Sequence, residues 1–239
     1  MRAWSPSLSL IALAPAIAWA SAGDDRAATT SAAEARPLFN GKDLRGWTTY
    51  IRHVDESGRP RPEVDPRADP GGVFRVEDGM IHVSGAEYGC LTTADEFSDY
   101  RLIVEFKWGK ARYLDRKDKV RDSGILLHCV GPDKIWTKSI ECQVQEGDCG
   151  DFWMVDGTTL KVDGKVEKSY KKKKTDAEKP SGEWNTIEVV CDGGRITNIV
   201  NGVVVNAGTD ASVTRGRILL QSEGAEVWFR KVELIPLKK

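Results

Sequence analysis

The sequence predicts an all-β protein built as a sandwich or barrel of antiparallel strands. Turn signals, most of them Asp, Asn or Ser followed by Gly, recur at short intervals along the chain. The segments between them are short and rich in Val, Ile, Phe and Trp, which is typical of strands. Only residues 94–99 suggest a helical turn, so a fold of alternating helices and strands is disfavoured. The turn signals include Asn40-Gly41, Asp78-Gly79, Ser84-Gly85, Asp156-Gly157, Asp163-Gly164 and Asn201-Gly202.

The N-terminal residues differ in composition from the rest of the chain. Residues 1–22 have the pattern of an export signal, with a positive Arg2, a short apolar run and small residues at a cleavage site. The run is too short for a membrane span and is interrupted by Pro15. Residues 23–36 are rich in Ala, Thr, Ser and charge, which predicts a disordered tether. We therefore expect one folded domain over 37–239, in an exported protein that is periplasmic or extracellular.

Two hairpins are predicted where Asp-Gly or Asn-Gly separates two strand-like segments. The first joins 73–77 to 80–84, and the second joins 195–200 to 203–207. These dipeptides favour the tight turns of two-residue hairpins. Both hairpins fit an antiparallel sheet.

Two long segments lack any strand pattern. Residues 50–72 are rich in Pro, Asp and Arg, and residues 110–122 are dense in charge. Loops of this length within a compact domain are usually functional or disordered. We expect both to line the rim of a cleft.

Alternation of residue types predicts which face of each strand is buried. In 101–108 the even positions are apolar, while Glu105 and Lys107 lie on the opposite face. In 122–130 Ile125, Leu127 and Cys129 are expected on one face, and Gly124, Leu126 and His128 on the other. If these strands are neighbours of 139–145 and 217–223, one sheet face carries Glu105, Lys107, His128, Glu141, Gln143, Gln145 and Gln221.

The most informative segment is 139–145. Ser139, Glu141, Gln143 and Gln145 occupy every second position, and apolar residues occupy the positions between them. A strand here has one polar face and one apolar face. A carboxylate beside carboxamides offers several acceptors and donors in one plane, which suits sugar hydroxyls. The alternative is an ordinary polar outer face of a sheet.

An acidic, Gly-rich turn follows at 146–151. Its oxygen ligands could hold a cation, although the spacing does not fit an EF-hand. A plain turn capped by Asp is the other interpretation. Trp136 and Trp153 border the polar segment and are candidates for stacking on a sugar ring, whereas Trp108, Trp184 and Trp228 are expected in the core.

Charge and cysteine content exclude some functions. The net charge is −1 with acids and bases interspersed, so no electrostatic footprint for nucleic acid is present. The basic block 171–174 is interpreted as a solvated loop.

The five cysteines leave at least one thiol free, and their spacing does not resemble a zinc site. Cys129 and Cys142 could meet across neighbouring strands, but Cys142 lies on an apolar face and is interpreted as a small buried residue.

Several blocks of sequence together resemble the 3-keto-disaccharide hydrolase family, in the same order and over essentially all of the folded part. Many relatives carry Asn-Ser-Gly where this chain has Asp122-Ser123-Gly124. The resemblance implies a concanavalin A-like jelly roll of two curved antiparallel sheets, with the sugar site on the concave sheet. The blocks are LFNGKDLRGW, VEDGMIHVSG, RDSGILLHC, SIECQVQEGDCGDFW, GEWNTIEV, NGVVVNA and RILLQSEGAEVWFRKVEL.

The resemblance also implies a chemistry. Oxidation of C3 of a glycoside acidifies the hydrogen on C2, so a base can remove it and the enolate can expel the anomeric group. Such a site needs a base, an acid and a group that stabilises the enolate oxygen. We expect Glu141, His128 and Glu105 to be catalytic. A divalent metal ion could polarise the ketone, with His128 and Glu141 as its expected ligands. The expected substrate-binding residues are Gln143, Gln145, Lys107, Trp136, Trp153 and Asp122.

Two other functions fit the same face. A non-catalytic, lectin-like module would bind glycans in an open groove lined by Trp. A conventional glycosidase would place two carboxylates across the scissile bond, and Glu105 and Glu141 are the pair that the sequence nominates. In each case the ligand is a small sugar or an oligosaccharide, and the sequence leaves the oligomeric state open.

Overall fold

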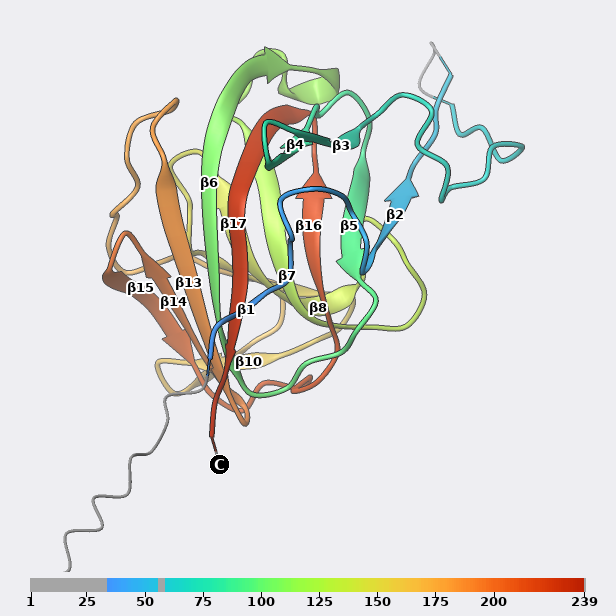
Figure 1. The fold of residues 1–239 in the computed structure, drawn as a ribbon. Coiled ribbons are helices and arrows are strands. Elements are labelled where there is room, and N and C mark those ends of the chain that lie inside the picture. Colours follow the sequence, from blue (N-terminus) through green and yellow to red (C-terminus); the bar gives the residue numbers. More distant parts are fainter. Residues whose placement is uncertain (1–33, 56–58, 239) are drawn as a thin grey trace, which may run out of the picture. The chain divides into compact units, whose positions relative to one another are not determined.

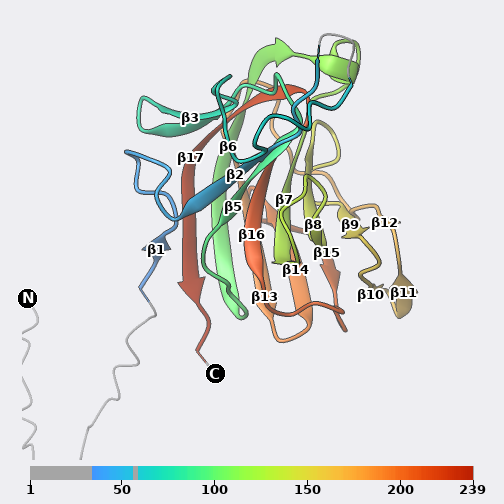
Figure 2. The ribbon, with the colours of Figure 1, turned by 90° about the vertical axis from the view of Figure 1, so that its right-hand side faces the viewer.

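Two antiparallel β-sheets pack face to face in the computed structural model, which describes residues 34–55 and 59–238. Figure 1 shows the long strands β6 and β17 side by side and curved, and Figure 2 shows β5, β16, β7 and β8 as neighbours in the second layer. The predicted sandwich of curved antiparallel sheets is confirmed. The expected export signal lies outside the described residues, as does most of the expected tether.

The larger sheet has eight strands among the described residues, and the smaller has seven. In spatial order the eight-stranded sheet contains β15 (Val203–Gly208), β14 (Arg195–Val200), β13 (Asn185–Asp192), β6 (Tyr100–Arg112), β17 (Ala225–Pro236), β4 (Met80–Val83) and β3 (Phe74–Glu77), with β1 (Arg36–Pro37) paired to β17. The seven-stranded sheet contains β12 (Tyr170–Lys171), β9 (Phe152–Val155), β8 (Lys138–Gln145), β7 (Asp122–Val130), β16 (Arg217–Ser222), β5 (Gly89–Thr93) and β2 (Trp47–Ile51). A small separate hairpin is formed by β10 (Leu160–Val162) and β11 (Lys165–Glu167).

The predicted helical turn at 94–99 is wrong. That segment consists of bends, and Phe97 forms an isolated β-bridge with Gly216. In the described part of the chain the sole helical element is the short 3₁₀ turn η1 (Leu114–Arg116). Within the same residues no helix has the length and hydrophobicity that crossing a membrane requires.

Both predicted hairpins are confirmed. β3 and β4 are joined by Asp78 and Gly79, and β14 and β15 by Asn201 and Gly202. All four turn residues have positive φ, which is the conformation of a type I′ turn. Gly tolerates this conformation without steric cost, and Asn and Asp tolerate it better than most other residues. The sequence signal therefore has a direct backbone cause.

The hydrophobic core lies between the sheets and is built from alternate residues of their strands. In β6 the predicted set Leu102, Val104, Phe106 and Trp108 is buried there. Complete burial of such a side chain contributes about 1.5–3 kcal/mol to folding. From β8, the predicted apolar set Ile140, Cys142 and Val144 joins the same core.

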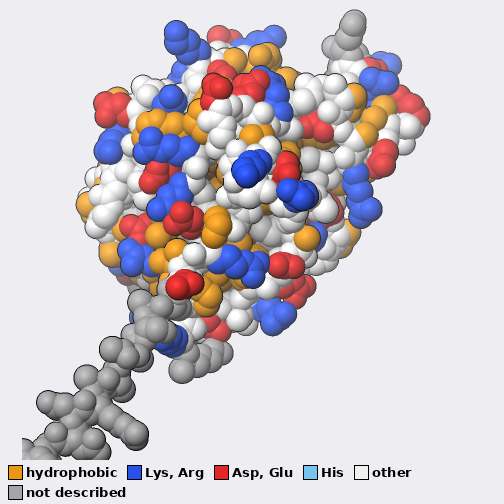
Figure 3. All heavy atoms as spheres, viewed as in Figure 1, with side chains coloured by type: hydrophobic (Ala, Val, Ile, Leu, Met, Phe, Trp, Pro, Cys, Tyr) orange, Lys and Arg blue, Asp and Glu red, His pale blue; other side chains and the backbone are white. Residues whose placement is uncertain are grey.

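Trp184 and Trp228 are not core residues, contrary to the prediction. Both are only partly buried. Trp228 pairs in register with Lys107, so it shares the outer, charged face of the eight-stranded sheet. The ring of Trp184 lies under the cations of Lys107 and Arg230, at 5.0 and 4.2 Å. Figure 3 shows basic and acidic side chains interspersed over the face of the molecule seen in Figure 1.

The seven-stranded sheet also has an outer face, directed away from the core. A small apolar cluster lies on it, formed by Cys90, Leu126, Cys129 and Leu219. Leu126 pairs directly with Glu141, and directly paired residues of antiparallel strands project to the same side. Glu141 therefore lies on this outer face.

All five cysteines are buried and free. Cys142 belongs to the main core, while Cys129 lies in the cluster on the outer face. The two thiols are thus on opposite sides of the sheet. The interpretation of Cys142 as a small buried residue is confirmed.

Candidate functional site

A glycine opens the outer face of the seven-stranded sheet at its centre. A Cβ on Gly124 would lie only 2.0 Å from Oε1 of Glu141 and 2.0 Å from Oε1 of Gln221. These two side chains therefore meet above Gly124, in space that any other residue would fill. Since Gly124 has no side chain, groups from β8 and β16 converge over β7.

Three buried carboxyl groups gather beside this opening. Asp122, Glu141 and Glu223 are 3%, 4% and 5% exposed. Together with Arg116, Trp136, Gln143, Trp153 and their neighbours they line a cavity of about 320 Å³, which we call the acid cavity. The cavity combines acidic, basic, amide and aromatic groups.

The carboxyl groups have raised pKa values. Burial raises the pKa of Glu141 well above its usual range, and the nearby negative charges of Glu223 and Asp122 add to this. Burial raises the pKa of Glu223 to about 7, against the lowering effect of a hydrogen bond from Trp136. Burial and Glu223 raise the pKa of Asp122 to about 8, although Arg116 opposes that shift. The protonated form of Glu141 is therefore favoured, while Glu223, with a pKa of about 7, can exchange a proton near neutral pH.

Arg116 supplies the positive charge of the acid cavity. It comes from η1, within a loop that the sequence predicted at the rim of a cleft. Its guanidinium donates a hydrogen bond to Asp122, and a long one of 3.5 Å from Nη1 to Oε1 of Gln145. Gln145 in turn donates from Nε2 to Asp148 at 2.8 Å. Gln145 thus supports Arg116 and does not itself line the cavity.

Several polar atoms at this site are buried and lack a hydrogen-bond partner among the described residues. They are Nε of Arg116, Oδ1 of Asp122 and Oε1 of Gln221. Leaving such atoms unpaired costs about 1–3 kcal/mol each. Buried polar groups in proteins nearly always find a partner, so these atoms are suited to a polar ligand or ordered water.

Two tryptophans form the walls of the acid cavity. Trp136 donates a hydrogen bond from Nε1 to Oε1 of Glu223 at 2.7 Å, which fixes its indole ring, and it is 46% exposed. Trp153 is 39% exposed and packs against Tyr170, with the ring centroids 4.8 Å apart and the ring planes tilted by 50°. Exposed aromatic rings held in place beside polar groups suit the apolar face of a sugar. The structure therefore brings both candidate tryptophans to the site.

Gln143 lies in the cavity next to Glu141 on β8. Its Oε1 accepts a hydrogen bond from the backbone N–H of Val144 at 3.0 Å, which leaves the amide NH₂ to donate to a ligand. Asp122 also lines the cavity, beside Arg116. Of the residues expected at the site, Glu141, Gln143, Asp122, Trp136 and Trp153 are brought together.

His128 does not share a face with Glu141, and that prediction is wrong. The pairing of β7 with β8 shifts register after Leu127, and His128 has φ of 54°, as in a β-bulge. The extra residue reverses the alternation, so Cys129 takes the outer face. His128 contacts the ring of the core residue Tyr100 and hydrogen-bonds through Nε2 to the carbonyl oxygen of Ser98 at 3.0 Å.

Glu105 and Lys107 lie on the other sheet, because β6 is a strand of the eight-stranded sheet. Both face outwards there. Glu105 forms an ion pair with Arg230, and Lys107 lies over Trp184. The prediction that they share a face with Glu141 is therefore wrong.

The pair of metal ligands expected from the sequence is also separated. His128 and Glu141 lie on opposite sides of β7 and β8, so they cannot bind the same ion. In residues 34–55 and 59–238 no group of three or more His, Cys, Asp or Glu residues has an arrangement that could hold a metal ion. The metal ligands expected from the sequence therefore do not form a common site.

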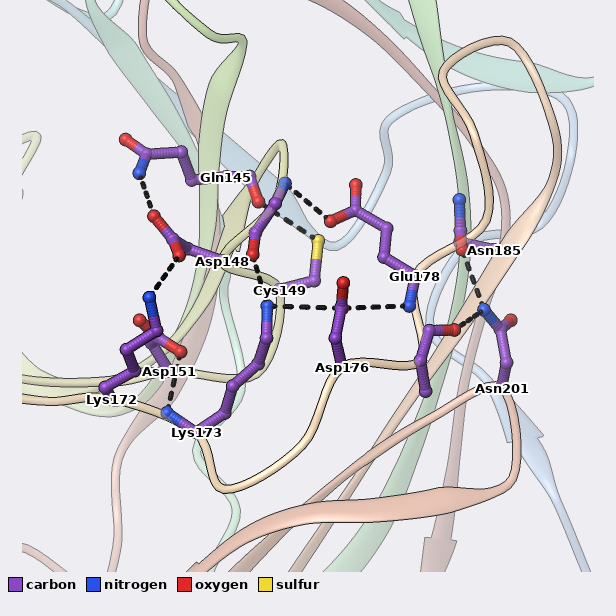
Figure 4. Close-up of polar contacts among 12 residues, drawn as sticks. Gln145, Asp148, Cys149, Asp151, Lys172, Lys173, Asp176, Glu178, Asn185 and Asn201 are labelled. Atoms are coloured by element: carbon purple, nitrogen blue, oxygen red, sulfur yellow. Dashed lines mark hydrogen bonds and ion pairs between the residues drawn. The ribbon is translucent and has the colours of Figure 1, made fainter.

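The acidic turn after β8 already contains a cation of the protein itself (Figure 4). The side chain of Lys173 is only 3% exposed, and its Nζ donates to the carbonyl oxygen of Gly147 at 2.5 Å. Its ammonium is 3.4 Å from Oδ1 of Asp176, and its backbone N–H donates to Asp151 at 2.8 Å. Glu178 accepts the N–H of Gly147 at 2.8 Å. The buried Lys173 thus links Gly147 of the turn to Asp176 through a hydrogen bond and an ion pair.

Sequence reasoning missed Glu223 and Arg116. Glu223 could have been found, because it stands two residues after Gln221, and alternate residues share a face. Arg116 is one of several basic residues in its loop, and no pattern distinguishes it from Lys110, Lys117 or Lys119.

Comparisons with known proteins agree with this architecture. Residues 34–235 match the sequence model of the family described as a 3-keto-alpha-glucoside-1,2-lyase-like domain. No curated protein matches the chain. A "putative glycosyl hydrolase" from Parabacteroides distasonis is similar in structure, with 22% identity, a TM-score of 0.57, and coverage of 85% of this chain and 94% of the other.

Two further solved structures are similar. The β-glucanase of Bacillus licheniformis has 13% identity and a TM-score of 0.51, with 87% of this chain and 100% of the other covered. The carbohydrate recognition domain of Emp47p has 12% identity and a TM-score of 0.51, with 87% and 98% covered. At such identities the likeness establishes the fold, and the predicted concanavalin A-like jelly roll is confirmed.

Proposed function

The chain belongs to the family of 3-keto-alpha-glucoside-1,2-lyase-like domains, and we propose that it cleaves the glycosidic bond of 3-keto-glycosides in the acid cavity. The observation that carries this proposal is the convergence of three buried carboxyl groups and one arginine between two exposed tryptophans. Acid, base and positive charge are what the elimination requires, and aromatic walls suit the sugar that undergoes it.

Glu223 is the proposed base. Its pKa of about 7 is close to an ordinary working pH, where a base combines adequate strength with a sufficient ionised fraction. It takes the proton from C2 of the keto-sugar, and the electrons of that C–H bond form an enolate on the former C3 carbonyl oxygen. The positive charge of Arg116 stabilises this oxygen, an effect that can reach about 10²–10³ in rate.

Glu141 is the proposed acid. Its pKa is raised well above the usual range, which favours the protonated form that an acid needs. As the enolate electrons expel the anomeric substituent, the C1–O bond breaks and Glu141 gives its proton to the departing oxygen. The products are an unsaturated ketone and a free alcohol. Glu223 then releases its proton to solvent and Glu141 regains one, and addition of water to the unsaturated ketone would make the overall reaction a hydrolysis.

Asp122 holds Arg116, and Gln143 donates to a sugar hydroxyl. No step is assigned to His128, Glu105 or Lys107, which lie elsewhere. No step is routed through a metal ion, because the expected ligands His128 and Glu141 lie on opposite sides of the sheet. Burial of the carboxyl groups favours an enzyme over a lectin-like module, which would need only an open groove.

A conventional glycosidase is the second candidate, because Glu141 and Glu223 are two carboxyl groups that line one cavity. One experiment separates the two. The protein is incubated with a 3-keto-α-glucoside and with its unoxidised parent, with and without a chelator, and the products are identified by mass spectrometry. Cleavage of the keto form alone, to an unsaturated ketone or its hydrate, is expected. Cleavage of the parent would favour the glycosidase, and binding without turnover would favour the lectin.

We also propose that the protein is exported, on the pattern of residues 1–22. Determining the N-terminus of the protein recovered from outside the cytoplasm tests this, and an intact Met1 in the cytoplasm would contradict it.

A further inference from the structure

A second and larger hollow lies on the outer face of the seven-stranded sheet. Its volume is about 610 Å³. It is lined from β2 by Tyr50 and from the end of β7 by Cys129. Cys129 belongs to the same small apolar cluster as Leu126, which pairs with Glu141. The second hollow and the acid cavity therefore share one face of one sheet.

The buried apolar cluster on this face lies on the strands that border the two hollows. Its member Cys90 pairs with Gln221, beside the acid cavity, and also with Tyr50, in the second hollow. Tyr50 packs against the cluster. The two hollows are thus neighbours across β16, β5 and β2.

One loop, residues 131–137, contributes to both hollows. Its first half, Gly131–Asp133, lines the second hollow, and Trp136 lines the acid cavity. Hydrogen bonds from β16 side chains hold the loop in place. Nε2 of Gln221 donates to the carbonyl oxygen of Ile135 at 3.2 Å, and Arg217 donates to that of Gly131 at 2.9 Å. Trp136, at the other end of this loop from Gly131, presents its exposed ring to the acid cavity.

The second hollow has the chemistry of a sugar subsite. Arg217 and Asp133 form an ion pair at 2.6 Å, with side chains only 19% and 12% exposed, so a donor and an acceptor are held side by side for neighbouring hydroxyls. Tyr50 adds an aromatic ring. The lining contains two basic and three acidic side chains, so its net charge is small. A small net charge favours a neutral ligand over an ionic one. The charged residues of the lining are Arg67, Arg217, Asp65, Glu96 and Asp133.

We propose that the second hollow binds a further sugar unit of the glycan that reacts in the acid cavity, so that the substrate is an oligosaccharide. This inference rests on the proposed function. It assigns a role to the long loop 50–72, whose residues Asp65, Pro66 and Arg67 form one wall of the hollow.

The test compares substrates of different length. α-Linked gluco-oligosaccharides of two and four units, each with the terminal unit oxidised at C3, are assayed for kcat/KM. The wild-type protein should prefer the longer substrate. Tyr50→Ala and Arg67→Ala should each reduce this preference by about tenfold, the loss that corresponds to about 1.4 kcal/mol. Arg61→Ala is the matched control, because Arg61 is an exposed residue of the same loop that does not line the second hollow.

Two outcomes overturn the inference while leaving the proposed function intact: equal kcat/KM for both lengths, or an unchanged preference in both variants. If no keto-sugar is cleaved, the proposed function fails, and the subsite is judged by binding alone. Calorimetry with the unoxidised two-unit and four-unit oligosaccharides then decides. Tighter binding of the longer one, weakened by Tyr50→Ala but not by Arg61→Ala, supports the subsite, and equal binding refutes it.

Discussion

Oε1 of Glu141 and Oε1 of Gln221 meet above Gly124, each 2.0 Å from the point that a Cβ on that residue would occupy. The oxygen of Gln221 is buried without a hydrogen-bond donor among the described residues. The ends of both side chains thus occupy the space that the missing side chain of Gly124 leaves on the outer face of the seven-stranded sheet.

Gly124→Ala should therefore damage the site directly. The new methyl group would displace both side chains, and overpacking of this kind costs about 1–3 kcal/mol of stability. We expect a lower midpoint of thermal unfolding and a loss of turnover. Gly71→Ala is the control, since a Cβ there meets its nearest atom at an ordinary 3.6 Å. Unchanged activity in Gly124→Ala would show that the contact between Glu141 and Gln221 is unimportant.

Glu141→Gln should reduce kcat by about 10²–10⁴, the contribution of a positioned acid or base. Its folding should be little affected, because glutamine has nearly the same shape and the raised pKa of Glu141 favours its uncharged form. Turnover and urea unfolding measured on the same preparation separate the two effects. Rates like those of the wild type would remove Glu141 from the chemistry.

Trp136→Phe should change the pH dependence of the reaction. The hydrogen bond from Trp136 lowers the pKa of Glu223, so its loss should raise that pKa above about 7. If Glu223 is the base, the acidic limb of the kcat/KM profile then moves to higher pH. Trp153→Phe is the control, because Trp153 makes no hydrogen bond to Glu223 and should leave this limb in place while weakening substrate binding. A limb that stays fixed in Trp136→Phe would indicate another base.

Stability should fall as the pH rises above the ordinary range of carboxyl groups. In the unfolded chain Glu141 loses its proton near pH 4, but in the folded protein it keeps that proton to a much higher pH. The folded state then binds more protons, so the free energy of unfolding decreases by up to about 1.4 kcal/mol per pH unit for this group. Urea unfolding between pH 5 and 8 should show a shallower decrease in Glu141→Gln. Identical slopes in both proteins would mean that Glu141 ionises normally.

The sequence was sufficient to predict the sandwich, the two hairpins and the polar face of 139–145. Each rests on a local cause: an alternation of side chains, or a turn that needs positive φ. The sequence could not assign Glu105 and Lys107 to the correct sheet, because an amphipathic strand fits the edge or centre of either sheet equally well. The strand pairing that decides this is not encoded in β6 alone.

His128 shows a different limit. One bulged residue in β7 reverses every side chain after it, and no turn or proline marks the position in the sequence. The same alternation, applied correctly to β16, would have led from Gln221 to Glu223. The carboxyl group of Glu223 was thus within reach of sequence reasoning, whereas the bulge was not.

The buried Lys173 connects the acidic turn to the aromatic wall of the acid cavity. Its Nζ donates to the carbonyl oxygen of Gly147, and its backbone N–H donates to Asp151, which also accepts a hydrogen bond from Tyr170. Because the ring of Tyr170 packs against Trp153, loss of the Lys173 side chain should disturb that wall although the lysine itself does not line the cavity.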